Sequence, residues 1–155
     1  MYGKRHTQKI VNLIKKENPD LVLIGGDLIN TPKPIYAKFF QNFREIKVPI
    51  YAVIGNHDVF FIGLTTKVFE EICRIGKITP LRNTSLIQDG IQITGIDDKD
   101  LRGKESLDDI LKKCNIQSTG HFSILLTHRP IHLSKLADYP IDLELAGHTH
   151  NGQIR

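Results

Sequence analysis

The sequence has no tryptophan, one methionine, at position 1, and two cysteines, Cys73 and Cys114. The cysteines form no C-x-x-C pair, so they are expected to be reduced, half-buried thiols in a reducing compartment. No apolar run reaches the ~18 residues that a membrane span needs. The first six residues lead into an amphipathic pattern without the features of a signal peptide. These absences predict a cytoplasmic location.

The chain also lacks a concentrated charge of one sign. Its formal net charge is +4, but the lysines and arginines are scattered and no basic stripe carries interleaved aromatic residues. Nucleic acid is therefore not an expected partner, whereas a small anionic substrate is compatible with the positive sign. The 155 residues contain no repeat and no linker, which predicts a single domain over 1–155.

Hydrophobic periodicity predicts alternating helices and strands. Helical spacing covers 4–17, 34–46, 65–75 and 106–114, and Ser106 stands three residues before Asp109, as in a helix capping box. Short apolar runs typical of buried strands cover 21–25, 48–54, 122–128 and 142–147, with short strands near 78–81. Residues 85–97 alternate apolar and polar side chains around Asp89-Gly90, which predicts a β-hairpin and hence a mixed sheet or a second sheet. The predicted fold class is α/β, with helices covering a largely parallel sheet.

Polar side chains follow four of these predicted strands directly. They are Asp27, the run Asn56-His57-Asp58, His128, and the run His148-Thr149-His150. Ligands of open α/β sheets bind at the carboxyl ends of parallel strands. Taken singly, each motif is more often a turn or a structural residue, except that alternate histidines on an extended segment can share one site. Their joint occurrence at strand ends predicts a common site.

The expected metal ligands comprise one carboxylate, one amide oxygen and three imidazoles, namely Asp27, Asn56, His128, His148 and His150. Such a set suits manganese, iron, cobalt or zinc and argues against a structural zinc site rich in sulfur. A carboxylate among neutral ligands can bridge two ions ~3.5–4 Å apart, which hold a hydroxide and clamp a phosphate.

The motifs around these residues resemble those of the calcineurin-like metallophosphoesterases. They are Gly26-Asp27, Gly55-Asn56-His57-Asp58, His128 and Gly147-His148-Thr149-His150. The sequence around the first and last motifs is similar to that of a bacterial, often membrane-associated branch of this family. Some members of that branch hydrolyse UDP-diacylglucosamine or related phosphodiesters. The resemblance covers nearly the whole chain and implies a mixed β-sheet sandwich flanked by helices.

The resemblance implies hydrolysis of a phosphodiester or phosphomonoester by a metal-bound hydroxide. Asp27 would bridge two divalent ions and His150 would bind one of them. The other ion would be completed by Asn56, His128 and His148. His57 would stabilise the transition state or protonate the leaving oxygen, with Asp58 orienting its imidazole.

One family feature is missing from this chain. The family opens with a strand ending in Asp-x-His, and only Met1-Tyr2-Gly3 precede the first predicted helix. The family also usually continues with a further strand after the last motif, whereas this chain stops at Arg155. The chain is therefore expected to be a fragment cut at both ends that lacks the first strand, with one metal site incomplete and with unpaired apolar sheet edges. Membrane association through the missing upstream segment stays open.

A second interpretation is a non-catalytic binding or scaffold module with the same fold. Retention of His57, Asp58 and the five predicted ligands favours the enzyme. An upstream Asp-x-His in the reading frame would support the enzyme, and a natural start at Met1 would support the scaffold. A nucleotide-binding protein without metal is disfavoured, because Gly25-Gly26 precedes an aspartate and not a helix with lysine and serine or threonine.

Overall fold

The computed structural model describes residues 3–30, 34–59, 64–98, 105–116 and 120–150. The chain forms two compact units, each assembled from separate stretches of sequence. Unit 1 comprises Met1–Ile24, Leu28–Ala52 and His57–Pro80, and unit 2 comprises Gly25–Asp27, Val53–Asn56 and Leu81–Arg155. The chain therefore passes into unit 2 directly after each of the first two strands.

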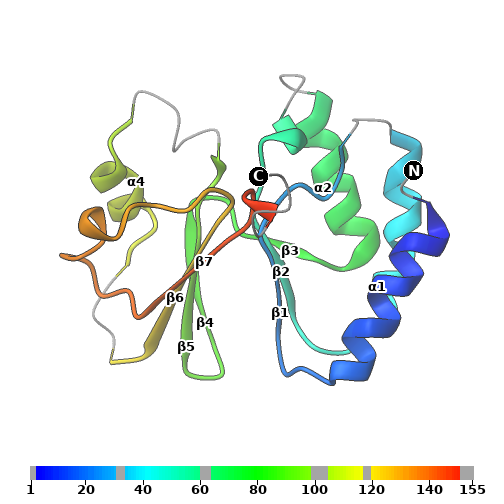
Figure 1. The fold of residues 1–155 in the computed structure, drawn as a ribbon, viewed down its shortest axis with the longest axis horizontal. Helices are drawn as coiled ribbons and strands as arrows, with labels where there is room; N and C mark the ends of the chain where they lie inside the picture. The colour runs from blue at the N-terminus through cyan, green and yellow to red at the C-terminus, as the bar shows by residue number, and fades with distance from the viewer. Residues whose placement is uncertain (1–2, 31–33, 60–63, 99–104, 117–119, 151–155) are drawn as a thin grey trace. The chain divides into compact units, whose positions relative to one another are not determined.

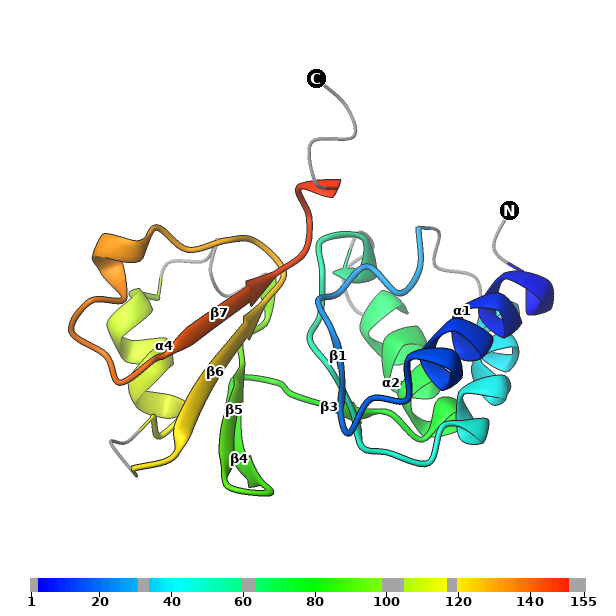
Figure 2. The ribbon, with the colours of Figure 1, turned by 60° about the horizontal axis from the view of Figure 1, so that its bottom comes forward.

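Unit 1 contains a three-stranded parallel sheet in the order β1-β2-β3. Three helices lie on one side of this sheet (Figure 1 and Figure 2). The strands are β1 (Val22–Ile24), β2 (Ile50–Ala52) and β3 (Thr79–Pro80), and the helices are α1 (Lys4–Glu17), η1 (Pro34–Glu45) and α2 (Leu64–Gly76). These elements confirm the predicted ones, with shorter strands than the apolar runs suggested.

The second helix of unit 1, η1, is a 3₁₀ helix and not the α-helix that its spacing predicted. Buried apolar side chains recur at every third position along this helix, at Ala37, Phe40 and Phe43, and the same spacing continues to Ile46, directly after the helix. This matches the three residues per turn of a 3₁₀ helix. Helices α1 and η1 are joined by the Thr7 hydroxyl, which donates to the Phe39 carbonyl at 2.7 Å.

Unit 2 contains a four-stranded mixed sheet in the order β4-β5-β6-β7. Its strands are β4 (Thr84–Gln88), β5 (Ile91–Gly95), β6 (Phe122–Thr127) and β7 (Leu143–Ala146). Strands β4 and β5 form the predicted hairpin, in which Asp89 and Gly90 have φ of 49° and 79°. Two consecutive positive φ values are typical of a type I′ turn, which favours glycine at the second position. Strands β5, β6 and β7 are parallel.

Helix α4 (Leu107–Lys113) packs on one side of this sheet (Figure 1). Its core includes Ile110, Leu111 and Leu125. Ser106 caps the helix by accepting a hydrogen bond from the Asp109 N–H at 3.1 Å, as the sequence predicted. Cys73 and Cys114 form no disulfide and are buried, not half-buried. Burial, followed by the charge of Asp97, raises the pKa of Cys114 to about 11.

The predicted α/β fold class, with mixed strands flanked by helices, is confirmed, and its parallel strands are divided between two sheets. The mixed character and the second sheet are both present. Strand β7 pairs with β6 alone within the described part of the chain, and its Leu143 and Leu145 side chains are 39% and 37% exposed. An apolar edge strand of this kind is normally covered in soluble proteins. None of the helices in the described ranges is long and apolar enough to cross a membrane.

Candidate metal centre

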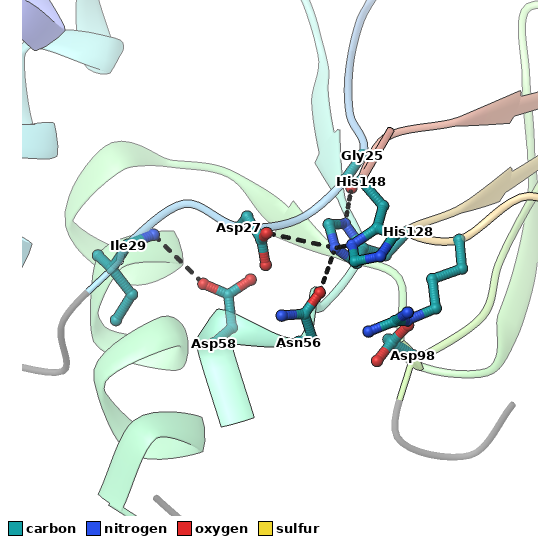
Figure 3. Close-up of polar contacts among 9 residues, drawn as sticks. Gly25, Asp27, Ile29, Asn56, Asp58, Asp98, His128 and His148 are labelled. Atoms are coloured by element: carbon teal, nitrogen blue, oxygen red, sulfur yellow. Dashed lines mark hydrogen bonds and ion pairs between the residues drawn. The ribbon is translucent and has the colours of Figure 1, made fainter. Parts of the chain in front are cut away.

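Four polar side chains meet in unit 2, each delivered by the end of a different strand (Figure 3). Asp27 follows β1, Asn56 follows β2, His128 is the first residue after β6, and His148 follows β7. The side chains lie in contact, as expected from their positions after strands, and their roles as metal ligands stay a prediction. Asp27 and Asn56 follow strands of the three-stranded sheet, and His128 and His148 follow strands of the four-stranded sheet.

The Nε2 atom of His128 lies at the centre of this group. It is 2.9 Å from Asn56 Oδ1, 3.2 Å from His148 Nδ1 and 3.3 Å from Asp27 Oδ2. Ligand atoms ~2.1 Å from one ion and roughly 90–110° apart would be separated by about 3.0–3.4 Å. The observed separations therefore match those of atoms that share a small cation. Asp27, His128 and His148 alone already offer ligand atoms within 4.8 Å of one another.

The tautomer of His128 is set by the backbone. Its Nδ1 lies 2.7 Å from the Gly25 carbonyl oxygen, which can only accept, so Nδ1 carries the proton. In a neutral ring the lone pair is then on Nε2, which faces the other three side chains. Metal-bound histidines are typically oriented in this way by a second hydrogen bond. The ring is 1% exposed, so this orientation is held by packing as well.

The two histidines have opposite pKa shifts. Burial opposes protonation of His128, but its hydrogen bonds to Asp27 and Gly25 and the charges of Asp27 and Asp98 outweigh burial and raise its pKa. Burial, then the positive charges of Arg129 and His128, lower the pKa of His148. The rings meet edge to face with centroids 5.0 Å apart. Two imidazoles this close cannot both carry a positive charge at low cost, so the pair favours at least one neutral ring, which keeps a lone pair on one nitrogen.

Glycines leave the space that the site needs. A Cβ added to Gly55 would lie 2.2 Å from Asp27 Oδ1, and one added to Gly26 would lie 2.8 Å from His128 Nδ1. A Cβ added to Gly147 would lie 2.7 Å from the Gly25 carbonyl oxygen that orients His128. The φ of Gly55 is not positive, so glycine is not required there for its backbone conformation. Its requirement is steric.

The backbone at two predicted ligands is left-handed. Asp27 and His148 have φ of 55° and 62°, and Gly26 precedes Asp27 with φ of 87°. Left-handed conformations in residues other than glycine cost energy and cluster at functional sites. The fold thus accepts local strain where it presents these two side chains.

His150 is exposed and is not part of the group that His128 centres. The sequence argument required an extended His148-Thr149-His150 segment, and this expectation is wrong. Both histidines have positive φ, with 49° at His150, and the Thr149 N–H donates to the Gly147 carbonyl at 2.7 Å. This tight turn removes the alternation on which the argument depended. A ligand role for His150 stays a prediction.

His57 and Asp58 lie in unit 1, on the short 3₁₀ turn η2 (His57–Val59). Asp58 is fully buried, and its Oδ1 accepts a hydrogen bond from the Ile29 N–H at 3.3 Å (Figure 3). Asp58 therefore anchors the chain just after Asp27. Its predicted action on the His57 imidazole, and the catalytic role of His57, stay predictions.

Sequence reasoning missed an ion pair beside the cluster. The Arg129 Nε donates to Asp98 Oδ1 at 2.8 Å, and the Asp98 side chain is fully buried. Asp98 follows β5, which is parallel to β6. The sequence predicted β5 only as part of an antiparallel hairpin, so its end was not considered as the end of a parallel strand. With β5 known to be parallel to β6, the same argument would have included Asp98.

The comparisons with known proteins give one family for the chain. The model of the family "Calcineurin-like phosphoesterase" matches residues 3–152. The chain belongs to the calcineurin-like phosphoesterase family. Membership supports a metal-dependent phosphoesterase activity in general.

Relatives give the same family assignment, and a solved structure shares the fold. The chain is 34% identical to the uncharacterized metallophosphoesterase YkuE of Bacillus subtilis, over 94% of this chain and 52% of YkuE. It is 32% identical to a "Transmembrane protein with metallophosphoesterase domain" of Danio rerio, over 98% of this chain and 38% of that protein. The crystal structure of TT1561 of Thermus thermophilus matches with a TM-score of 0.67 at 16% identity, covering 90% of this chain and 74% of that one. The chain thus spans about half the length of YkuE, and the structural match supports the predicted α/β fold.

Proposed function

We propose that this chain carries the metal centre of a phosphoesterase that hydrolyses a phosphodiester or phosphomonoester. The observation that supports this most is the set of oxygen and nitrogen atoms around His128 Nε2. A single proton on Nε2 can be shared with only one of its neighbours at a time, whereas a divalent cation interacts favourably with all of them. The family match supports the same assignment.

The donor set fits a divalent ion of the manganese, iron, cobalt or zinc type. One carboxylate, one amide oxygen and two imidazoles would hold this ion through Asp27, Asn56, His128 and His148. Divalent ions bound here would supply Lewis-acid activation of the phosphate and of a water molecule. The chain's own contribution is to orient His128 through Gly25 and to hold Asp27 and His148 in left-handed conformations.

A second ion is part of the proposal. Asp27 would be shared between the two ions, and His150 would bind the second. Because these residues alone make a sparse ligand set, the second site of this chain should be weak. Calorimetric titration with Mn²⁺ is expected to show one tight site per chain, and two tight sites would contradict this.

His57 is proposed to stabilise the transition state or protonate the leaving oxygen. His57→Ala is then expected to lower kcat on bis(p-nitrophenyl) phosphate by about 10²–10⁴-fold, the usual range for a general acid, while Mn²⁺ affinity is kept. His132→Ala is the matched control, because His132 is an exposed histidine whose ring contacts Ser134. Unchanged kcat in His57→Ala would exclude this role. Tight Mn²⁺ binding without hydrolysis of any ester by the wild type would favour the scaffold interpretation.

Membrane association of the whole protein is proposed to depend on sequence outside residues 1–155. The name of the Danio rerio relative supports this, because it joins a transmembrane protein to a metallophosphoesterase domain. Fractionation of cells expressing the full reading frame would test it, with recovery in the membrane pellet as the expected result.

A further inference from the structure

The pair formed by Asp98 and Arg129 lies at the same sheet edge as the metal ligands of β6 and β7. Asp98 follows β5, Arg129 directly follows His128, and β5 and β6 are parallel neighbours. The Arg129 Nε donates to Asp98 Oδ1 at 2.8 Å, so the guanidinium is held between the ends of these two strands. Arg129 is also the next residue after His128, the central residue of the cluster.

The backbone that carries Arg129 is fixed on both sides. Glu144 on β7 accepts hydrogen bonds from the Thr127 hydroxyl at 3.3 Å and from the Ile131 N–H at 2.7 Å. These residues flank His128 and Arg129. The Asp98 N–H also donates to the Ile54 carbonyl at 3.2 Å, two residues before Asn56. Arg129 therefore projects from a held segment and not from a free loop.

The guanidinium is oriented but not buried. Its Nε is bonded to Asp98, whereas the side chain remains 35% exposed. Within the described residues no hydrogen bond joins its two terminal nitrogens to another group. An arginine has five N–H donors in a planar fork that matches phosphate oxygens. The terminal donors are therefore available to an anion.

The electrostatic setting favours an anion at this position. A fixed positive charge beside a cation site raises the energy of the bound cation, unless negative charge lies between them. Asp98 offsets part of that repulsion through its ion pair with the guanidinium. A phosphate that contacts both the ion and the guanidinium would offset the rest.

We propose that Arg129, held by the buried Asp98, binds a phosphate oxygen of the substrate beside the metal centre. This inference rests on the proposed phosphoesterase function and adds to it a residue that touches the substrate. It assigns to the pair the recognition of the phosphate group itself, whatever alcohol the ester carries. Asp98 is a positioning residue, because it acts through Arg129.

The chain offers a matched control in the neighbouring pair. Arg82 Nε donates to Asp97 Oδ2 at 2.7 Å, with Arg82 30% exposed and Asp97 buried. Asp97 acts on Cys114 of the core, since its charge contributes to the raised pKa of that thiol. Arg129→Gln and Arg82→Gln thus remove the same kind of bond from two adjacent buried carboxylates.

The test titrates inorganic phosphate into the wild-type protein and each variant by calorimetry, with and without Mn²⁺. Arg129→Gln is expected to weaken phosphate binding by about tenfold, the loss of one charge-assisted hydrogen bond, and Arg82→Gln is expected to leave it unchanged. Arg129→Lys keeps the charge without the fork and should fall between wild type and Arg129→Gln. Asp98→Asn should weaken phosphate binding in the same direction as Arg129→Gln.

Thermal unfolding and Mn²⁺ affinity of each variant separate the possible outcomes. A purely structural role for Arg129 predicts lower unfolding temperature with unchanged phosphate affinity, as for Arg82→Gln, and this result would overturn the proposal. Absence of measurable phosphate binding by the wild type would overturn it as well. If the wild type did not bind Mn²⁺, the proposed function would be refuted. The phosphate titration without metal would then still show whether Arg129 binds phosphate.

Discussion

Replacing Asp27 with alanine is expected to lower the affinity of the protein for Mn²⁺ by about a hundredfold or more. Loss of a group that merely orients a ligand costs about 10–100-fold in metal affinity, and Asp27 would be a ligand itself. It is also the only carboxylate among the four side chains that meet at His128 Nε2. Without it, the ion would be held by neutral groups alone.

Isothermal titration with Mn²⁺ measures this effect directly, and thermal unfolding shows whether the variant is folded. Asp27→Asn should give an intermediate affinity, because the amide keeps an oxygen but loses the charge. Asp138→Ala is the matched control, since Asp138 is an exposed carboxylate of the same unit. If Asp27→Ala bound Mn²⁺ as tightly as Asp138→Ala, the cluster around His128 would not be the metal site.

Replacing Gly55 with alanine is expected to disrupt the site through sterics alone. The added Cβ would lie 2.2 Å from Asp27 Oδ1 and 2.5 Å from the Asp27 backbone nitrogen. Moving the Asp27 carboxylate alone cannot relieve both contacts, because the backbone nitrogen of Asp27 must move too. Overpacking of this kind costs typically about 1–3 kcal/mol, and the displaced Asp27 carboxylate should lower Mn²⁺ affinity at least tenfold, roughly the effect of a lost orienting contact.

Chemical denaturation and Mn²⁺ titration of Gly55→Ala would measure the two effects separately. Gly3→Ala is the control, because a Cβ at Gly3 would meet nothing within 4 Å and its φ of −139° suits alanine. Wild-type Mn²⁺ affinity in Gly55→Ala would show that Asp27 does not need its observed position.

Local chemistry made several elements predictable. The Asp89-Gly90 hairpin and the Ser106 cap depend on residues adjacent in sequence, and both are present as predicted. The positions of Asp27, Asn56, His128 and His148 after apolar strands predicted that these residues lie close together, and they do. The reason is that a buried strand must place its first polar residues where it reaches the surface.

Features that depend on distant residues were not predictable in the same way. The division of the parallel strands into two sheets is set by strand pairing, which apolar runs do not encode individually. The turn at His148 and His150 overrode the expectation of an extended segment. The pairing of Asp98 with Arg129 requires β5 and β6 to be neighbours.

The residue types that follow the apolar runs predicted the candidate ligands, and the motifs around them indicated the calcineurin-like phosphoesterase family to which the chain belongs. Other features depend on chain segments that approach within a few ångströms of one another in space. They are the steric need for glycine at positions 55 and 147, the tautomer of His128 and the position of Arg129. Such contacts join residues dozens of positions apart. The steric contacts and hydrogen bonds between such residues exist only once the backbone has folded, so a local sequence pattern does not predict them.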